Sequence, residues 1–236
     1  MNKAILKSLF IMLLGLLLVV AASSYGSEET SEVELKDRAT DGDPLAAYNY
    51  GRIKVLKKNY KEGIDWLKMA SHSDIPEAKY MLGLLYEQGL GTKKDFEKAF
   101  KFYKSSASSG LLEAKNNLAA MYFDGRGTDK NIEKALYWLH EAADGGLVSA
   151  QYYLGNLYKN GTSIPKDIPK AVMWLTKSAE QGNPKAQYLL STMYFNGDDV
   201  DKNCDKALYW ANKSADHGND NVKKYIWKIR FRCLIN

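Results

Sequence analysis

The sequence predicts an all-α fold: a right-handed α-solenoid of about five antiparallel helix pairs with a capping segment at each end. Two observations predict this fold. Lys-Ala pairs, tryptophans and glycines recur every 36 residues, and the apolar residues within each interval follow helical spacing. The Lys-Ala pairs stand at 98–99, 134–135, 170–171 and 206–207, the tryptophans are Trp138, Trp174 and Trp210, and the glycines are Gly89, Gly125, Gly161, Gly197, Gly110, Gly146, Gly182 and Gly218.

The first element in chain order is a predicted secretory signal peptide at 1–26. Lys3 and Lys7 precede an apolar run, Leu9–Ala22, and small and polar residues follow it. The run has about 14 residues, fewer than the roughly 20 of a membrane span. We expect cleavage near residues 24–27, a periplasmic or secreted mature chain, and no stable membrane insertion after cleavage. The alternative is a protein anchored to the membrane by an uncleaved N-terminus.

The composition limits the function classes. With 45% hydrophobic and 26% charged residues among 236, the chain is neither disordered nor collagen-like. Its net charge of +5 is mild and spread along the sequence, which excludes the clustered basic stripe of a nucleic-acid partner. Only three His and two Cys are present, few for zinc sites or catalytic dyads. We therefore expect no metal and no cofactor.

The pattern of each repeat predicts two helices, and the repeat 150–185 serves as the example. Ala150–Asn160 carries one apolar face, and Gly161 ends the helix as a capping glycine does. Asp167 can cap the second helix, and Gly182 closes it. The apolar stripe of that second helix is Ala171, Trp174, Leu175, Ser178 and Ala179.

The predicted organisation has a repeat region between two caps. Residues 27–45 are the N-terminal capping segment and residues 222–236 the C-terminal capping helix. The five repeats are 46–77, 78–113, 114–149, 150–185 and 186–221. The first repeat is shorter than the others because it lacks the Gly-x-Gly turn. Neither helix of a pair can bury its stripe alone, so stacked neighbours must do so.

The repeat resembles a known family. Ala-Gln-Tyr-Tyr-Leu-Gly-Asn-Leu-Tyr at 150–158, Lys-Ala-x-x-Trp at 170–174 and Ser-Ala-x-x-Gly at 178–182 are similar to the Sel-one-like repeat, a relative of the tetratricopeptide repeat. The resemblance implies a non-catalytic scaffold or adaptor that binds a protein or peptide. It also implies that the first helices of the repeats line a concave groove.

An enzyme is the alternative function. Some secreted, cysteine-rich members of this repeat family are described as β-lactamase-like or penicillin-binding, and this chain contains Ser163-Ile164-Pro165-Lys166, an S-x-x-K sequence. The S-D-N and K-T-G partner motifs are missing, and so are the paired cysteines of those repeats. His72, His140 and His217 occupy different repeat positions and form no ligand cluster, so we expect them at the solvent or at loop ends. No catalytic residue is predicted, and we expect the protein not to be an enzyme.

The predicted binding groove lies on the first helices, opposite their core stripe. Counting from the first alanine of each repeat, the third, seventh and tenth positions are rich in aromatic and amide side chains, where a solvated face would be charged. Tyrosine offers contact area and a hydroxyl, and asparagine can pair with a peptide backbone. The candidate residues are Tyr48, Tyr80, Asn116, Phe123, Tyr152, Asn156, Tyr188 and Phe195. The alternative is that these tyrosines only pack between neighbouring helices.

The C-terminal helix is predicted to cap the solenoid. Its stripe is Val222, Tyr225, Ile226, Ile229 and Cys233. Trp227 stands at a position where the other repeats carry a small residue that faces a second helix, and no second helix follows. Trp227 and Phe231 are therefore expected to cover the open end. Alternatively, this basic aromatic end docks a second copy, giving a homo-oligomer, or an anionic membrane surface.

The two cysteines are predicted to form a disulfide. Cys204 stands at the start of the last second helix, and Cys233 at the end of the capping helix. Because successive first helices stack roughly parallel, these two ends should be neighbours. Secretion into an oxidising compartment would favour the bond. The alternative is two small apolar core residues that never meet.

Overall fold

A computed structural model describes residues 32–219 and 222–234 of the chain. The predicted signal peptide, 1–26, and the first part of the N-terminal capping segment lie outside the described residues. Within them the structure has twelve helices and no strand, as the predicted all-α solenoid requires. The helices are α2 (Glu32–Thr40), α3 (Pro44–Leu56), α4 (Tyr60–Ser71), α5 (Pro76–Gln88), α6 (Phe96–Ser108), α7 (Leu112–Asp124), α8 (Ile132–Asp144), α9 (Val148–Asn160), α10 (Ile168–Glu180), α11 (Pro184–Asn196), α12 (Cys204–Asp216) and α13 (Val222–Leu234).

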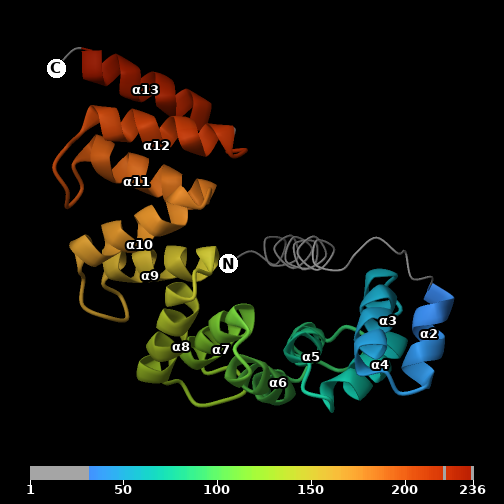
Figure 1. The fold of residues 1–236 in the computed structure, drawn as a ribbon. Coiled ribbons are helices and arrows are strands. Elements are labelled where there is room, and N and C mark those ends of the chain that lie inside the picture. Colours follow the sequence, from blue (N-terminus) through green and yellow to red (C-terminus); the bar gives the residue numbers. More distant parts are fainter. Residues whose placement is uncertain (1–31, 220–221, 235–236) are drawn as a thin grey trace.

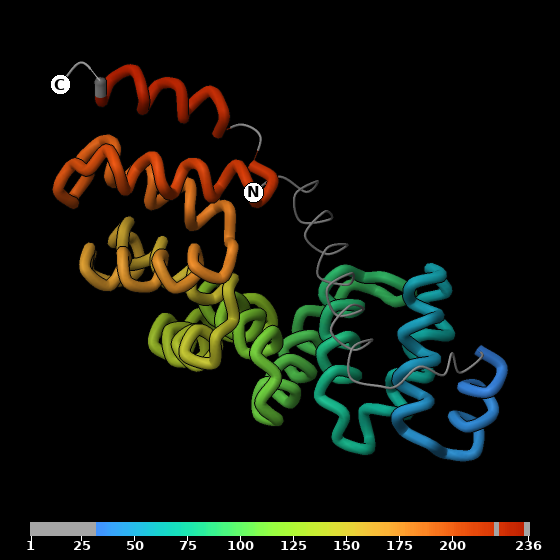
Figure 2. Tube along the Cα trace, turned by 45° about the horizontal axis from the view of Figure 1, so that its top comes forward, coloured from blue at the N-terminus to red at the C-terminus, as the bar shows by residue number. Residues whose placement is uncertain are grey.

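The helices stack in chain order. Each packs mainly on the helix before it and the helix after it, so the architecture is close to one-dimensional. Figures 1 and 2 show that the stack bends, with α2 to α8 forming one arm and α9 to α13 the other. None of the described helices is long and apolar enough to cross a membrane.

The first helices begin two residues earlier than the predicted repeat boundaries. Three of them start with proline: Pro44, Pro76 and Pro184. Proline suits the first turn because its missing N–H would have no helical partner there. At α3, the side chain of Asp43 also accepts hydrogen bonds from the backbone N–H groups of Leu45 and Ala46.

One capping residue closes each helical hairpin from the second repeat onward. Its side-chain oxygen accepts the backbone N–H three residues later, and its own N–H bonds the carbonyl of a tyrosine nine residues earlier, at 2.9 Å in every repeat. The capping residues are Asp95, Asn131, Asp167 and Asn203, and the tyrosines are Tyr86, Tyr122, Tyr158 and Tyr194. The turn therefore has the same closure whether the cap is Asp or Asn.

The recurrent Lys-Ala pair has a structural explanation. The alanines, Ala99, Ala135, Ala171 and Ala207, are fully buried between the helices. The lysine ammonium groups lie 5.0–5.7 Å from the centres of the same four hairpin tyrosine rings. A cation over an aromatic face is attracted by the ring quadrupole. The pair thus fixes the start of the second helix against the end of the first.

The sixth position of each repeat is where the paired helices come closest. A Cβ added to Gly83 would lie 2.6 Å from the Tyr103 ring, and one added to Gly155 would lie 2.6 Å from Leu175 Cγ. At the same position Ser191 fits by donating its hydroxyl to the Ala207 carbonyl at 2.8 Å. Only small side chains are compatible with this crossing.

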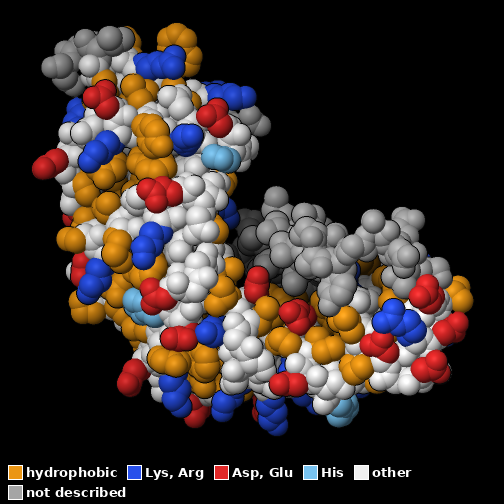
Figure 3. All heavy atoms as spheres, viewed as in Figure 1, with side chains coloured by type: hydrophobic (Ala, Val, Ile, Leu, Met, Phe, Trp, Pro, Cys, Tyr) orange, Lys and Arg blue, Asp and Glu red, His pale blue; other side chains and the backbone are white. Residues whose placement is uncertain are grey.

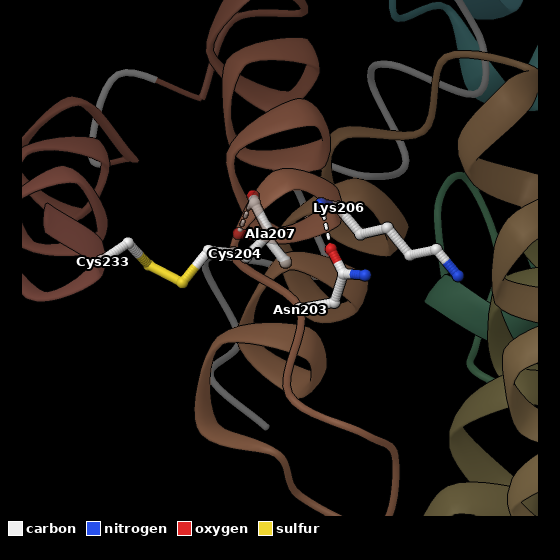
Figure 4. The surroundings of a disulfide bond; sticks show 6 residues. Asn203, Cys204, Lys206, Ala207 and Cys233 are labelled. Atoms are coloured by element: carbon white, nitrogen blue, oxygen red, sulfur yellow. Dashed lines mark hydrogen bonds between the residues drawn. A yellow bond between two sulfur atoms is a disulfide. The ribbon is translucent and has the colours of Figure 1, made fainter. Parts of the chain in front are cut away.

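The C-terminal end follows the predicted stripe. Val222, Ile226 and Ile229 are buried against the last repeat. The predicted disulfide between Cys204 and Cys233 is present and joins the start of α12 to α13, with Cα atoms 6.1 Å apart (Figure 4). Trp227 and Phe231 behave differently from the prediction.

Trp227 and Phe231 do not cover the open end. Their exposed fractions are 74% and 67%, because the buried stripe of α13 already seals the last repeat and leaves the opposite side of the helix to solvent. The prediction that these two aromatic side chains cover the open end is therefore wrong.

The two aspartate capping residues should make the stability of the fold sensitive to acid. The backbone N–H of Lys98 and then its ammonium group hold the pKa of Asp95 below its usual range, and Lys170 does the same to Asp167. A carboxylate whose pKa is lowered by folding contributes stability above its unfolded pKa of about 3.9 and loses it as the pH falls through the folded value. Asp95→Asn plus Asp167→Asn should therefore reduce the drop in melting temperature between neutral pH and about pH 3.

The two asparagine caps supply the control. Asn131→Asp plus Asn203→Asp should enlarge the same drop, since the new carboxylates would accept the same backbone N–H groups. Equal acid sensitivity in wild type and both double variants would contradict this account.

The close helix crossing predicts a position-dependent cost for larger side chains. Gly155→Val should lower the free energy of unfolding by about 1–3 kcal/mol, because its Cβ would meet Leu175. Trp227→Ala, at the same repeat position in α13, should change it by less than about 0.5 kcal/mol, because that side chain is exposed. Urea unfolding measures both, and equal costs would refute the assignment of this position.

The disulfide should stabilise the fold and protect both cysteines from alkylation. Cysteines 29 residues apart in sequence close a loop worth about 3–4 kcal/mol in the chain-entropy model. Cys204→Ser plus Cys233→Ser should lower the free energy of unfolding by up to that amount. Protein purified without reductant should take up no thiol-alkylating label, as measured by mass spectrometry. Two labelled cysteines would show that the bond does not form.

Candidate partner-binding surface

The structure divides the eight predicted groove residues into two groups. Three are buried and cannot offer a face to a partner: Tyr48, Tyr80 and Phe195, with exposed fractions of 6%, 0% and 3%. Asn116, Phe123, Tyr152 and Asn156 are half-buried, and Tyr188 is exposed. The expectation of a common accessible surface is therefore wrong for the first group.

Tyr80 is buried because the next elements of the chain close around it. Its ring lies 5.7 Å from the ring of Tyr103 on α6. Its hydroxyl accepts a hydrogen bond from the Asn117 amide of α7, at 3.5 Å. Burial, together with the nearby carboxylates of Glu113 and Glu87, raises the pKa of the Tyr80 phenol. The alternative that tyrosine at this position packs between helices holds here.

The other two buried residues lie towards the two ends of the repeat region. The Arg52 guanidinium lies over the Tyr48 ring at 5.8 Å, and burial raises the pKa of that tyrosine. Phe195 lies under the capping helix, where its ring meets Tyr225 at 5.5 Å and the Lys228 ammonium group at 6.0 Å.

A charged network occupies the tenth position of the second repeat. Glu87 accepts a hydrogen bond from the Tyr103 hydroxyl at 2.7 Å and forms an ion pair with the Arg126 guanidinium of the following repeat. Arg126 also reaches Asp124, at 3.1 Å. The carboxylate of Glu87 is thus used to join two repeats. Phe123 and Phe195 stand at the same position in later repeats, without a charge.

The half-buried and exposed residues belong to three successive first helices. We call the following five residues the aromatic-amide face: Asn116 and Phe123 of α7, Tyr152 and Asn156 of α9, and Tyr188 of α11. The Asn156 amide donates to the Tyr152 carbonyl at 3.1 Å, which orients the side chain along its helix. The Tyr188 ring is fixed by an edge contact with Tyr225, at 5.5 Å. Rigid aromatic groups beside amides can bind a peptide with little loss of side-chain entropy.

Two accessible features were not predicted from the sequence. Tyr153 has an exposed fraction of 46%, and its ring lies 5.9 Å from that of Tyr152. An open hollow of about 770 Å³ lies between the start of α10 and the loop 197–203. It is lined by apolar side chains such as Val172, Tyr194 and Val200 and by two aspartates. In the sequence, only the additional acidic residues of the loop 197–203 could have indicated this hollow.

The S-x-x-K residues lie in a loop, and the three histidines lie within or at the ends of second helices. Ser163 is exposed in the loop between α9 and α10, and the Lys166 ammonium pairs with the Asp199 carboxylate at 2.6 Å. His72 and His217 are exposed as expected, whereas His140 is half-buried beside the Tyr158 hydroxyl, at 3.2 Å. No cluster able to hold a metal ion occurs in the part of the chain that the structure describes.

The charges around these residues are mixed. On the side of the molecule drawn in Figure 3, acidic and basic side chains alternate with apolar patches along both arms. A partner of one strong charge is therefore not favoured by this side of the repeats.

Comparisons with known proteins give a consistent result. A family model described as Sel1 repeat matches five segments of the chain: 44–74, 76–111, 112–147, 148–183 and 184–219. These segments begin at the first residues of α3, α5, α7, α9 and α11. A search of curated proteins gives no match.

Solved structures are similar over most of the chain. A protective antigen of uropathogenic Escherichia coli with an SLR fold is 30% identical, with a TM-score of 0.76 over 83% of this chain and 43% of the antigen. A Sel1 repeat protein from Oxalobacter formigenes is also 30% identical, with a TM-score of 0.77 over 84% of this chain and 59% of its own. This chain therefore spans less than two thirds of either relative.

A more distant structure shares the fold alone. An immunity protein from Pseudomonas aeruginosa is 18% identical, with a TM-score of 0.57 over 80% of this chain and 73% of its own.

Proposed function

Because the chain belongs to the Sel1 repeat family, we propose that it is a non-catalytic scaffold or adaptor that binds another protein or a peptide. Its five repeats supply a large surface. A repeat fold by itself does not define a function. The aromatic-amide face of Asn116, Phe123, Tyr152, Asn156 and Tyr188 is the observation that carries the proposal.

The face differs from what solubility alone would select. Exposed helix surfaces are normally charged, yet these positions carry aromatic and amide side chains on three neighbouring repeats. Tyr152, Asn156 and Tyr188 are sufficiently accessible to make contacts and are held by their own helices or by Tyr225. An extended peptide laid across α7, α9 and α11 would meet hydrogen-bonding groups and aromatic rings in turn.

We also propose that this scaffold works in the cell envelope or outside the cell. The lysines, apolar run and small residues of 1–26 support export. The Cys204–Cys233 bond supports it independently, because disulfides persist in oxidising compartments. N-terminal sequencing of the protein recovered from cell fractions tests the proposal. A mature N-terminus near residues 24–27 in the envelope or medium is expected, and an intact Met1 in the cytosol would contradict it.

A binding experiment tests the proposed face. Tyr152→Ala plus Tyr188→Ala should weaken capture of the partner from an envelope extract, because both accessible rings are removed. The captured protein is identified by mass spectrometry, and its dissociation constant is then measured with purified components. We expect a rise of at least about tenfold in the double variant.

The matched control removes two other exposed tyrosines. Tyr137→Ala plus Tyr209→Ala changes the second helices α8 and α12, whose tyrosines have exposed fractions of 57% and 53%. This variant should bind as wild type does. Equal losses in both variants, or unchanged binding in the first, would contradict the assignment. Turnover of a chromogenic β-lactam by the wild-type protein would instead favour the enzyme alternative.

A further inference from the structure

The outward side of α13 carries the two most exposed aromatic side chains among the described residues. Trp227 and Phe231 are 74% and 67% exposed and stand one helical turn apart. Nothing in the fold requires them there, since Val222, Ile226 and Ile229 already bury the inner side of the helix. An exposed tryptophan and phenylalanine together are costly to keep in water and indicate a surface that contacts something else.

The charges of α13 are arranged around these aromatics. Residues 222–234 contain five cations and no acidic residue. Measured from Val222 at about 100° per residue, Trp227 and Phe231 lie at about 140° and 180°, the centre of the outward side. The cations flank this centre: Lys223 and Arg230 on one side, and Lys224, Lys228 and Arg232 on the other.

We propose that this side of α13 docks the protein onto an anionic phospholipid membrane surface. Lipid phosphates would contact the flanking cations, while Trp227 and Phe231 would enter the boundary between headgroups and acyl chains. A strip of aromatics between two rows of Lys and Arg is the arrangement that a helix lying in the membrane interface needs. The contact is peripheral and involves no spanning segment.

The position of α13 leaves its outward side accessible to a flat surface. Figures 1 and 2 show it as the last helix of the stack, with the repeats on one side only. The Cys204–Cys233 bond and the buried stripe fix the helix to the last repeat. The docking side is therefore presented by a helix that is already folded, so binding does not have to order it.

A second copy of the chain is a less favourable occupant. A two-fold contact through this side would bring two α13 helices together, each with five cations and no acidic residue within 222–234. Like charges across an interface oppose association. An acidic protein would satisfy the charges, but protein partners bind mainly through anchor residues that fill pockets, and the outward side of a single helix is convex. A lipid surface needs no pocket.

The test is a vesicle-binding assay with the full chain as cells process it. Vesicles of phosphatidylcholine with phosphatidylglycerol are compared with vesicles of phosphatidylcholine alone, by cosedimentation at low and high salt. Wild type should bind the anionic vesicles and lose binding at high salt. Trp227→Ala plus Phe231→Ala, and separately Lys224→Glu plus Arg230→Glu, should each lower the partition coefficient by at least about tenfold.

Matched variants exclude general effects of charge, hydrophobicity and the N-terminus. Tyr137→Ala plus Tyr209→Ala and Lys101→Glu plus Lys104→Glu change other exposed residues, on α6, α8 and α12, and should bind as wild type does. All variants carry the same N-terminus, so differences report α13. An unchanged melting temperature and an intact disulfide show that the fold is retained.

Three results would overturn the proposal. These are equal binding to neutral vesicles, no loss in the α13 variants, and no vesicle binding at all. In the last case, loss of a wild-type dimer in the α13 variants, measured by sedimentation, would identify a second copy as the occupant. Salt-sensitive binding of the same helix to an acidic protein would identify a protein surface.

Discussion

The close approach of the two helices in each repeat is the constraint on which the rest of the solenoid depends. Gly83 and Gly155 leave no room for a Cβ at the crossing, and Ser191 fits by bonding the Ala207 carbonyl. Helices this close bring the end of one within hydrogen-bonding reach of the start of the next, which permits the constant 2.9 Å bond from the capping residue to the hairpin tyrosine. The lysine above the tyrosine ring depends on the same approach.

The periodicity of the sequence was sufficient to predict the fold, the small position and the disulfide, but not the accessibility of the groove. The position of a residue in the repeat determines the direction in which its side chain leaves the helix. The burial of Ala171 and Leu175 follows from this direction. Whether an outward side chain stays exposed depends on its neighbours in its own repeat and in the element that follows. Asn117 and Tyr103 enclose Tyr80, and α13 covers Phe195, because of residues that differ from repeat to repeat. Tyr188 remains exposed although its ring makes a T-shaped contact with Tyr225.

The joints between repeats change in chemistry along the chain. In the second and third repeats, the residue after the repeat alanine is a lysine that forms an ion pair: Lys79 pairs with Asp74 of the preceding repeat, and Lys115 pairs with Glu141 of its own repeat. In the second arm it is a buried glutamine that donates to the carbonyl eight residues earlier, as Gln151 and Gln187 do at 3.1 and 2.8 Å. Exposed ion pairs are screened by salt and contribute little, whereas buried amide bonds are not screened. We therefore expect salt to weaken the Lys79–Asp74 joint more than the joints made by Gln151 and Gln187.

The capping helices at the two ends of the solenoid differ on the side that faces the solvent. A stack of repeats exposes apolar surface at both ends, and a cap must cover it while remaining soluble. At the N-terminal end, α2 does so with Leu35 and Ala39 turned inward, and Glu32 is paired with Lys54 and Lys57. At the other end, α13 covers the last repeat equally well but turns Trp227 and Phe231 outward. Sealing the stack explains the inner side of both helices. It does not explain the outer side of α13, where aromatic residues between cations indicate contact with an anionic surface.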